Sequence, residues 1–381
     1  MRLSTVFATC SVIVATPSTV LAVEGGAEDR TTTHSVAIAV GGPASPQVRC
    51  SGTLISKNVV LTVRHCISSL GTAPSACDAE LGPVSESLPD YWVSASPWAS
   101  AAWRRVREAR VPEATTVCGN DLALLVLDEA FEENEASPAI PVTSAEEFLR
   151  AAKSRAIGIS SFGGTTVAGA DRGMRRSRWD VPVRCVPSEP SFTCGRELDY
   201  IDAREFTVGN GPCPGDSGAG ALEPSSRSSV FGVLSRGNLE ATCAEGVFVR
   251  TDVWAWLLAR SVLDAAPGGD APEWAKRLFP TEPRAGEFCF GAGSCGAERE
   301  CISLDARRSW TCAERCSQGS CGAGSHCENG LCLPGDPPAD ASSSCSIGRI
   351  AEPRLNAPVC FAAIVFGAIA ILAARSRKRD Q

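Results

Sequence analysis

The sequence predicts an all-β domain that is followed by a small disulfide-rich module and one transmembrane helix. Short apolar runs alternate with turns rich in glycine, proline and serine, which is the pattern of an all-β fold. The chain has 19 cysteines and only 3 histidines, and this imbalance indicates disulfide bonds formed in an oxidising compartment. A second cysteine-rich stretch and a final apolar stretch follow the predicted strands.

The first 22 residues have the features of a secretory signal peptide. Arg2 precedes an apolar centre, and Val20-Leu21-Ala22 forms a small-x-small ending. A buried first helix is the alternative, which Pro17 disfavours because proline interrupts helices. We therefore expect a secreted protein whose mature chain begins at Val23.

A series of apolar runs predicts the strands of the first domain. These runs are residues 35–40, 53–56, 59–63, 121–127, 156–160, 180–185, 205–208, 229–234 and 246–250. Residues 144–153 predict a surface helix, because Ser144 and Glu147 have the spacing of a capping box. Residues 252–263 predict an amphipathic closing helix with Asp252 as its N-cap. The mild net charge of −7 gives no reason to expect nucleic-acid binding.

A serine in a glycine-rich turn is the first candidate for chemistry. Residues 211–220 have the sequence GPCPGDSGAG, with Ser217 between Asp216 and Gly218. Glycines permit backbone angles that expose the hydroxyl and direct neighbouring N–H groups at one place, as an oxyanion hole requires. A serine hydroxyl is a weak nucleophile alone, so this chemistry also needs a histidine base and an acid that orients it.

His65 and Asp121 are the candidates for the base and the acid. His65 follows an apolar run and lies between Cys50 and Cys66 in a short cysteine-bounded loop. The other two histidines are His34, which follows three threonines near the start of the chain, and His326, which lies in the second cysteine-rich stretch. Asp121 heads the apolar run 122–127, where a strand covered on both faces would bury it. The structural alternatives are a satisfied buried histidine and an ordinary turn aspartate.

These three segments, in the order histidine, aspartate and serine, resemble those of the trypsin/chymotrypsin-like serine proteases. The resemblance spans about residues 23–265 and implies two antiparallel six-stranded β-barrels, with a C-terminal helix. It implies that His65 is the general base and acid, Asp121 its orienting acid, and Ser217 the nucleophile.

The resemblance also implies the groups that support these three residues. The N–H groups of Gly215 and Ser217 would form the oxyanion hole. Cleavage after Ala22 would leave Val23-Glu-Gly-Gly at the new terminus, which resembles the mature start of family members. The α-amino group of Val23 would then turn inward and pair with Asp216, so that signal peptidase alone would generate the active terminus.

Eight cysteines between residues 50 and 243 are expected to form four disulfides. The resemblance implies Cys50–Cys66 beside the histidine and Cys213–Cys243 beside the substrate pocket. Four cysteines remain, and they allow three pairings. The short intervening loop favours Cys185–Cys194, which leaves Cys77–Cys118 to anchor the strand that carries Asp121.

Several positions match the family's substrate pocket. The resemblance places Gly211 at its base, where no carboxylate would attract lysine or arginine, so trypsin-like specificity is disfavoured. Gly237 and Gly246 match the pocket-wall glycines, and Pro212 constrains the wall. Ser235 and Arg236 begin the segment that pairs with the substrate backbone.

Two arginines depart from the family's pattern. Arg236 replaces a usual aromatic residue and leaves an acidic or a narrow preference open. Arg64 replaces a usual alanine before the histidine, and its guanidinium is expected to reach solvent or an acid.

After the first domain, the sequence predicts a linker and a disulfide-rich module. Residues 266–286 are the expected linker, and residues 287–334 form a disulfide-rich module that resembles EGF-like repeats only loosely. A zinc site is the competing reading of this module, which a single histidine and a secretory signal disfavour. Eight cysteines permit 105 pairings, so its connectivity stays open.

A spacer, an apolar segment and a basic cluster end the chain. The spacer is 335–356, the apolar segment 357–374 is at the short end of the roughly 17–25 residues that span a bilayer, and residues 375–381 would remain cytoplasmic. Cys345, the span and the basic end resemble myxobacterial C-terminal sorting tails. This resemblance implies removal of the tail, with Cys345 as the processing site.

Together these features predict a secreted, surface-anchored serine endopeptidase of the bacterial periplasm or cell surface. It would act on proteins or peptides as a monomer, associate with the membrane through its C-terminal helix or sorting tail, and need no metal or organic cofactor. A catalytically silent adhesion or binding protein with the same fold is the alternative from a different class. An esterase that acts on small esters is a third reading.

Overall fold

The computed structural model describes residues 22–68, 77–166, 168, 171–187, 189–238, 243–278, 299–303, 310–316, 320–322, 325–328 and 330–334. The expected signal peptide apart from Ala22, the spacer 335–356, the transmembrane segment 357–374 and the basic end 375–381 lie outside these residues. Within the described residues, no helix is long and apolar enough to cross a membrane.

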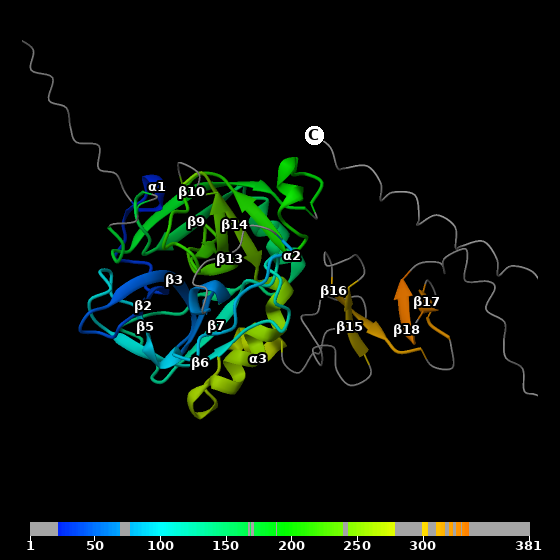
Figure 1. The fold of residues 1–381 in the computed structure, drawn as a ribbon, viewed down its shortest axis with the longest axis horizontal. Coiled ribbons are helices and arrows are strands. Elements are labelled where there is room, and N and C mark those ends of the chain that lie inside the picture. The colour runs from blue at the N-terminus through cyan, green and yellow to red at the C-terminus, as the bar shows by residue number, and fades with distance from the viewer. Residues whose placement is uncertain are drawn as a thin grey trace, which may run out of the picture. The chain divides into compact units, whose positions relative to one another are not determined.

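The first barrel is a closed ring of six antiparallel strands (Figure 1). In the order of the ring, these are β2 (Ser35–Val40), β3 (Gln47–Ser56), β4 (Val59–Thr62), β7 (Ala123–Leu127), β6 (Trp103–Arg110) and β5 (Tyr91–Ser94). The 3₁₀ helices η1 (Arg64–Ile67) and η2 (Leu88–Asp90) lie in the connections. Every residue of β7 is buried, as its continuous apolar sequence predicts.

The second barrel is also a closed ring of six antiparallel strands. Its strands are β9 (Ala156–Ser161), β10 (Arg176–Cys185), β11 (Glu205–Val208), β14 (Glu245–Arg250), β13 (Ser229–Asn238) and β12 (Gly220–Leu222), and β12 pairs with β9 to close the ring. Outside the ring, β1 (Ala27–Glu28) pairs with β10, and β8 (Ile140–Pro141) pairs with β13. The expected architecture of two six-stranded barrels is therefore confirmed.

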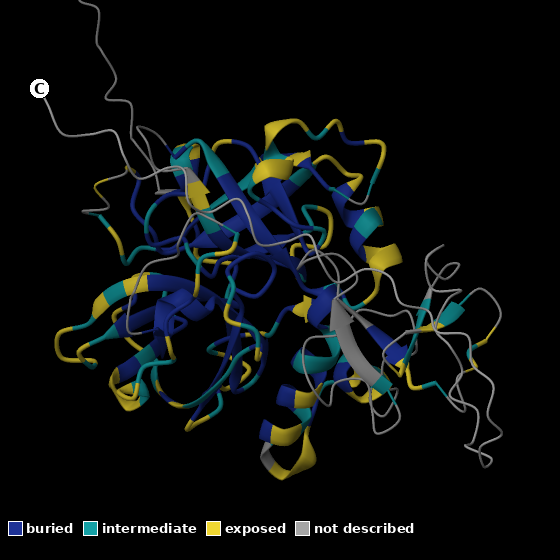
Figure 2. Cartoon of the chain, turned by 45° about the vertical axis from the view of Figure 1, so that its right-hand side comes forward, coloured by how far each residue is buried: buried dark blue, intermediate teal, exposed yellow. Residues whose placement is uncertain are grey.

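Each barrel encloses its own apolar core. Aliphatic residues such as Leu54 and Leu61 fill the first barrel. Aromatic rings fill the second, where the centroid of Phe206 lies 5.6 Å from Phe148 and 5.4 Å from Phe248. Figure 2 shows buried residues along the strands of both barrels and exposed residues mostly in the connections. Removal of these side chains from water supplies the main driving force for the fold.

One of the two expected helices begins as the sequence predicts and the other does not. Helix α2 (Ala145–Ala152) begins after Ser144, whose hydroxyl accepts from the Glu147 N–H at 3.3 Å, as the capping pattern predicts. The closing segment is the 3₁₀ helix η4 (Asp252–Trp254) followed by α3 (Ala255–Ala265), so Asp252 as the N-cap was wrong. Asp252 instead pairs with Arg250 at 2.6 Å, so its carboxylate is engaged by a guanidinium rather than by the first N–H groups of the helix.

The folded domain also continues into the segment that was expected to be a linker. The 3₁₀ helix η5 (Pro267–Gly269) and helix α4 (Glu273–Leu278) follow α3. Ala271 and Ala275 of this segment are buried in the apolar cluster that includes the core of the first barrel. The first part of the expected linker 266–286 is therefore packed, because its apolar side chains add to the core.

The remaining described elements are two hairpins and two short segments. In the disulfide-rich module, β15 (Arg299–Ser303) pairs with β16 (Trp310–Glu314), and β17 (Ser325–Glu328) pairs with β18 (Leu331–Pro334). Disulfides Cys316–Cys327 and Cys321–Cys332 lie in this module. Elsewhere, α1 (Ala22–Gly25) is a non-helical turn, and η3 (Arg196–Asp199) lies between β10 and β11.

Candidate active site

The ends of two paired strands bring His65 and Asp121 together. His65 lies in η1, three residues after the end of β4, and Asp121 lies two residues before the start of β7. These strands pair with Thr62 opposite Ala123, so the residues just beyond the two positions must be neighbours. The fold of the first barrel therefore builds this half of the candidate site.

Asp121 contacts His65 at two points. The His65 backbone N–H donates to Asp121 Oδ1 at 3.0 Å, and His65 Nδ1 lies 2.8 Å from Asp121 Oδ2. The Ser235 hydroxyl donates to the same Oδ2 at 2.7 Å. Complete burial would raise the pKa of Asp121, but the attraction of His65 and the hydrogen bonds from His65 and Ser235 hold it below its usual value. Asp121 is therefore an ionised acid that fixes the imidazole.

Ser217 lies in the turn between β11 and β12, where the first barrel touches the second. The Ser51 N–H of β3 donates to Ser217 O at 2.8 Å, and the Ser51 hydroxyl donates to Gly215 O at 3.0 Å. Gly218 has φ +87°, and a Cβ there would overlap Ser51 O and Thr62 Oγ1. Glycine is therefore required at position 218, because the backbone there has a positive φ and because the two barrels approach each other closely.

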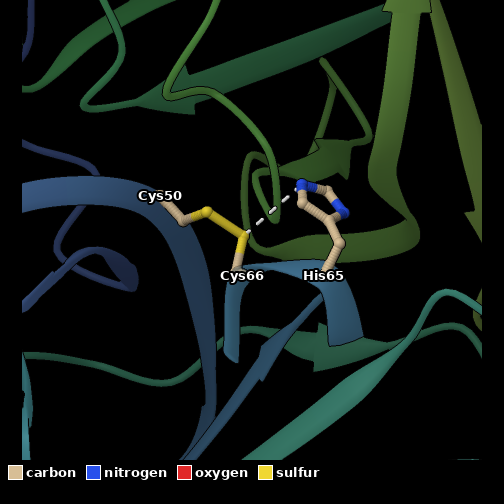
Figure 3. Close-up of side chains that lie close together, drawn as sticks. All are labelled: Cys50, His65 and Cys66. Atoms are coloured by element: carbon tan, nitrogen blue, oxygen red, sulfur yellow. Dashed lines mark hydrogen bonds between the residues drawn. A yellow bond between two sulfur atoms is a disulfide. The ribbon is translucent and has the colours of Figure 1, made fainter. Parts of the chain in front are cut away.

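The imidazole has a sulfur neighbour as well as an acid. His65 Nε2 lies 3.8 Å from Cys66 Sγ, and the Cys50–Cys66 disulfide runs beside the ring (Figure 3). In the described part of the chain, no hydrogen bond joins Ser217 Oγ to His65. Catalytic hydrogen bonds are often long without substrate and tighten in the complex, so this geometry is compatible with a serine–histidine pair.

The turn around Ser217 directs its N–H groups to different sides. The N–H groups of Asp216 and Gly218 donate inward, to Cys213 O at 3.0 Å and Leu234 O at 2.8 Å. Those of Gly215 and Ser217 donate to no group among the described residues. The same turn thus offers two available donors near the Ser217 hydroxyl.

Asp216 is buried beneath this turn. Its carboxylate accepts from the Ser161 hydroxyl at 2.6 Å, the Gly163 N–H at 3.0 Å and the Cys213 N–H at 2.7 Å. Burial raises the pKa of Asp216 to about 6, although these hydrogen bonds act in the opposite direction. Among the described residues, Asp216 makes no ion pair, and it makes none with Val23.

Val23 is fully buried among core residues of the second barrel. The next N–H, that of Glu24, donates to Gly211 O at 2.8 Å. Val23 has φ +44°, which is unusual for a β-branched residue. The unprocessed chain thus holds Val23 inside the barrel with a strained torsion on its amino side.

Four disulfides hold the candidate site and its surroundings. They are Cys50–Cys66, Cys77–Cys118, Cys185–Cys194 and Cys213–Cys243, the four pairs predicted from the sequence. Cys118 lies three residues before Asp121. Cys213 lies four residues before Ser217.

The pocket positions lie on three segments of the second barrel. Gly211 and Pro212 precede the serine turn, Arg236 and Gly237 lie on β13, and Gly246 lies on β14 opposite Gly237. A Cβ on Gly246 would lie 2.7 Å from Pro212 Cγ, so the Pro212 ring packs against this glycine. A Cβ on Gly211 would lie 3.2 Å from Val181, so an apolar residue lies beside the predicted base.

Arg64 was expected to reach solvent or an acid, and the structure shows a different solution. Its guanidinium is buried and donates to three backbone carbonyls: Gly82 O and Pro112 O, both at 3.3 Å, and Ala114 O at 3.2 Å. Carbonyl oxygens of the connections therefore satisfy it. Nothing in the local sequence signals this, because the three acceptors are backbone atoms of a distant segment.

Arg236 is also turned inward. Its side chain is 7% exposed and pairs with the fully buried carboxylate of Glu205 on β11 at 2.6 Å. Sequence reasoning missed Glu205, whose charge within the run 205–208 was the available signal. An acid in an apolar strand predicts a buried partner, because an unpaired buried charge is costly.

Within the part of the chain that the structure describes, three groups of side chains have the composition of metal ligands. They are Cys50, His65 and Cys66; Cys77, Cys118 and Glu205; and Cys316, Cys321 and Cys332. All of these cysteines are in disulfides. A cysteine binds a metal as a thiolate, so the donor sets do not fit a metal while the bonds are intact.

Comparison with known proteins identifies the family. The model of the Trypsin family matches residues 23–257 of the chain, which include the histidine, aspartate and serine segments. A search of curated proteins finds no match.

Proposed function

Because this chain belongs to the trypsin family of serine peptidases, we propose that it is a secreted endopeptidase that uses His65, Asp121 and Ser217 as a catalytic triad. The observation that carries the proposal is the twofold contact between His65 and Asp121, at 2.8 and 3.0 Å, beside the turn of Ser217. A buried acid that holds the imidazole by both its ring and its backbone keeps the other ring nitrogen available as a base.

The residues have separate roles in the proposed reaction. Ser217 Oγ attacks the carbonyl carbon of the scissile peptide bond while His65 Nε2 accepts the hydroxyl proton. The resulting oxyanion accepts from the N–H groups of Gly215 and Ser217. His65 then donates the proton to the leaving amine, and water repeats the sequence on the acyl-enzyme to release the acid and restore Ser217.

The position of Val23 supports a simple route to the active form. Cleavage after Ala22 removes the strained torsion, because an amino-terminal residue has no preceding carbonyl that defines φ. It also creates an α-ammonium next to Glu24, whose N–H donates to Gly211 O, and the buried Asp216 has no ion-pair partner among the described residues. We propose that this ammonium pairs with Asp216 and that signal peptidase produces it. Sequencing of the secreted amino terminus tests this step: Val23 is expected, and any other start contradicts it.

The pocket geometry favours apolar side chains of limited size. The predicted base has glycine rather than an acid, and Pro212 packs against Gly246. Arg236 pairs with Glu205 and is therefore unavailable to select acidic side chains. These contacts support a preference for small or medium aliphatic residues before the scissile bond.

We also propose that the C-terminal tail tethers the enzyme. The apolar segment 357–374 and the basic cluster behind it have the pattern of a membrane anchor with the protease outside. The intact mass of the C-terminal peptide distinguishes permanent anchoring from processing at Cys345. A peptide that ends at Gln381 contradicts processing.

Hydrolysis of a peptide library by the secreted protein and by its Ser217→Ala variant tests the enzymatic proposal. We expect the unmodified protein to cleave after aliphatic residues and the variant to be inactive. Equal activity of the two would contradict the role of Ser217. Inactivity of both, with Val23 as the verified terminus, would favour a binding protein.

A further inference from the structure

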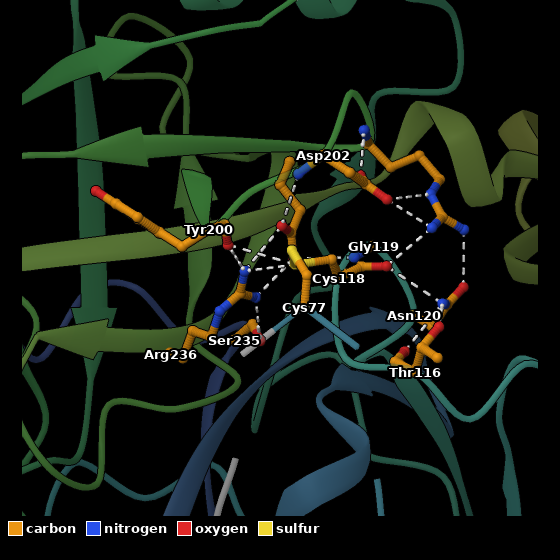
Figure 4. Close-up of a disulfide and its surroundings, with 11 residues drawn as sticks. Cys77, Thr116, Cys118, Gly119, Asn120, Tyr200, Asp202, Ser235 and Arg236 are labelled. Carbon is orange, nitrogen blue, oxygen red and sulfur yellow. Dashed lines mark hydrogen bonds and ion pairs between the residues drawn. A yellow bond between two sulfur atoms is a disulfide. The ribbon is translucent and has the colours of Figure 1, made fainter. Parts of the chain in front are cut away.

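A buried ion pair of the second barrel lies beside the loop that leads to Asp121. Arg236 on β13 and Glu205 on β11 form two contacts, Nη1 to Oε1 at 2.6 Å and Nη2 to Oε2 at 2.9 Å (Figure 4 shows Arg236 and its surroundings). Arg236 Nη2 also donates to Tyr200 O at 2.7 Å. Arg236 is thus fixed on one side by a carboxylate and on another by the backbone that precedes β11.

The pair reaches directly across to the first barrel. Glu205 Oε1 accepts from the Gly119 N–H at 2.9 Å, and Arg236 Nη2 lies 3.1 Å from Cys118 Sγ. Gly119 has φ +72°, so its backbone takes a conformation that fixes the direction of its N–H. The pair therefore holds the two residues that stand three and two positions before Asp121.

Two neighbouring side chains also bond to this loop, one from the residue before β11 and one from η4. Arg204 donates to Cys118 O and to Asn120 Oδ1, both at 2.8 Å, and the Trp254 indole donates to Gly119 O at 2.8 Å. Through Arg204 and Glu205, each of residues 118–120 is therefore bonded to a side chain at or beside β11 of the second barrel. Because Ser217 belongs to that same barrel, these bonds link the two halves of the candidate site.

A second path leads from the pair to the carboxylate itself. Arg236 Nη1 lies 3.4 Å from Ser235 Oγ, and that hydroxyl donates to Asp121 Oδ2 at 2.7 Å. The donated proton of Ser235 must point at Asp121, and a guanidinium on the other side of the oxygen favours that orientation. Arg236 thus acts on Asp121 both through the loop and through Ser235.

Stability alone is a weak explanation for such a pair. The cost of removing two charges from water can exceed what their attraction returns, and apolar replacements of similar size are often neutral or stabilising. What a buried, geometrically specific pair provides is a fixed arrangement of the groups around it. Asp121 needs such an arrangement, since small displacements in a catalytic site have large effects on rate.

We propose that the Glu205–Arg236 ion pair is a positioning device that sets the orientation of Asp121 against His65 from the opposite barrel. This inference rests on the proposed triad for its effect on rate, but not for its effect on the geometry of the His65–Asp121 pair. Both side chains are turned inward, so neither side chain touches the substrate or the reacting atoms.

The test compares variants of the purified secreted protein. Arg236→Met removes the charge and keeps the stem, Glu205→Gln keeps the size of the acid, and Arg236→Lys retains a charge that can pair with Glu205. The matched control is Asp252→Asn, which breaks the Arg250–Asp252 pair, also 2.6 Å long and with both side chains 3% exposed. That pair makes no hydrogen bond to residues 118–121 or to Ser235 among the described contacts.

Two readouts separate positioning from general stability. We expect Arg236→Met and Glu205→Gln to lower kcat by about 10- to 100-fold with KM changed by less than about twofold. Arg236→Lys should recover part of the loss, and Asp252→Asn should lose stability but keep kcat within about twofold. The low-field proton resonance of His65 Nδ1–H should move or disappear in Arg236→Met and stay in place in Asp252→Asn.

The opposite results overturn the proposal. If Arg236→Met has the same kcat and the same His65 resonance as Asp252→Asn, the Glu205–Arg236 pair has a structural role only. If Arg236→Met fails to fold, the same comparison with Arg236→Lys and Glu205→Gln decides the question. If the unmodified protein hydrolyses no peptide, the proposed function fails, while the resonance comparison still decides whether the pair positions Asp121.

Discussion

The carboxylate of Asp121 contacts His65 at two atoms: Oδ2 lies 2.8 Å from the ring Nδ1 of His65, and Oδ1 accepts from the His65 backbone N–H at 3.0 Å. The carboxylate therefore fixes both the tilt of the ring and the position of the backbone that carries it. An amide of the same size can accept from only one of these donors.

Asp121→Asn should accordingly lower kcat by about 10⁴, the cost of this change in a serine-protease triad, because the amide favours the wrong tautomer of His65. Steady-state kinetics on a cleaved peptide measures it. Asp128→Asn makes the same substitution at an exposed acid and should leave kcat unaltered. A loss for Asp121→Asn no larger than that of the control would remove Asp121 from the triad.

The buried Asp216 gives the unprocessed chain a distinctive pH dependence. Its folded-state pKa is raised to about 6, so folding favours the protonated form. The stabilisation is present below the unfolded pKa of about 4 and is lost as pH rises to about 6, with a slope approaching 1.4 kcal/mol per pH unit.

Denaturant unfolding between pH 4 and pH 7 measures this effect in a Ser217→Ala background, with Asp216→Asn as the reference. Relative to Asp216→Asn, the unprocessed chain should lose stability as pH rises. The chain that begins at Val23 should not, because its α-ammonium stabilises the ionised carboxylate. The same slope in both chains would argue against the Val23–Asp216 pair.

The aromatic cluster of the second barrel should dominate its stability. Phe206 is fully buried between Phe148, Phe231 and Phe248. Phe206→Ala should lower the free energy of unfolding by about 3–5 kcal/mol, because it removes buried area and leaves a cavity. The matched control is the exposed Leu198, where replacement by alanine should change the free energy of unfolding by less than about 0.5 kcal/mol. Similar losses for the two variants would contradict the assignment of this cluster as the core.

The Cys77–Cys118 bond should matter for activity as well as for stability. It spans 41 residues and Cys185–Cys194 spans 9, so loss of each bond by a double change to alanine should cost about 4 and about 2.5 kcal/mol, respectively. Only the first change frees the loop before Asp121, and only this variant should lose kcat at temperatures where both remain folded. Thermal unfolding and kinetics on the two double variants measure this. An equal kcat for both would show that the loop keeps its position without the bond.

Much of the candidate site was predictable because its signals are local. A glycine on each side of the Asp216-Ser217 pair, an apolar run before His65 and another after Asp121 mark the three segments without knowledge of the fold. The short loop between Cys185 and Cys194 likewise indicated its own bond. Both barrels follow from the resemblance that these segments carry.

The unpredicted features depend on partners far apart in the chain. Arg64 finds its acceptors at residues 82, 112 and 114, and Arg236 finds Glu205 on another strand. Periodicity places a residue on a strand but does not give the neighbour across the barrel. The packed helix α4 was missed for a related reason, since its buried face is set by α3 and the first barrel rather than by its own short sequence.

The reactivity of Ser217 tests the central claim most directly. Purified protein that begins at Val23 is incubated with a fluorophosphonate probe, and the labelled peptide is identified by mass spectrometry beside the Ser217→Ala variant. We expect a single label on Ser217 and none on the variant, because only a hydroxyl activated by His65 attacks the phosphorus. Absence of the label from the unmodified protein, with Val23 verified as its first residue, would contradict a working triad.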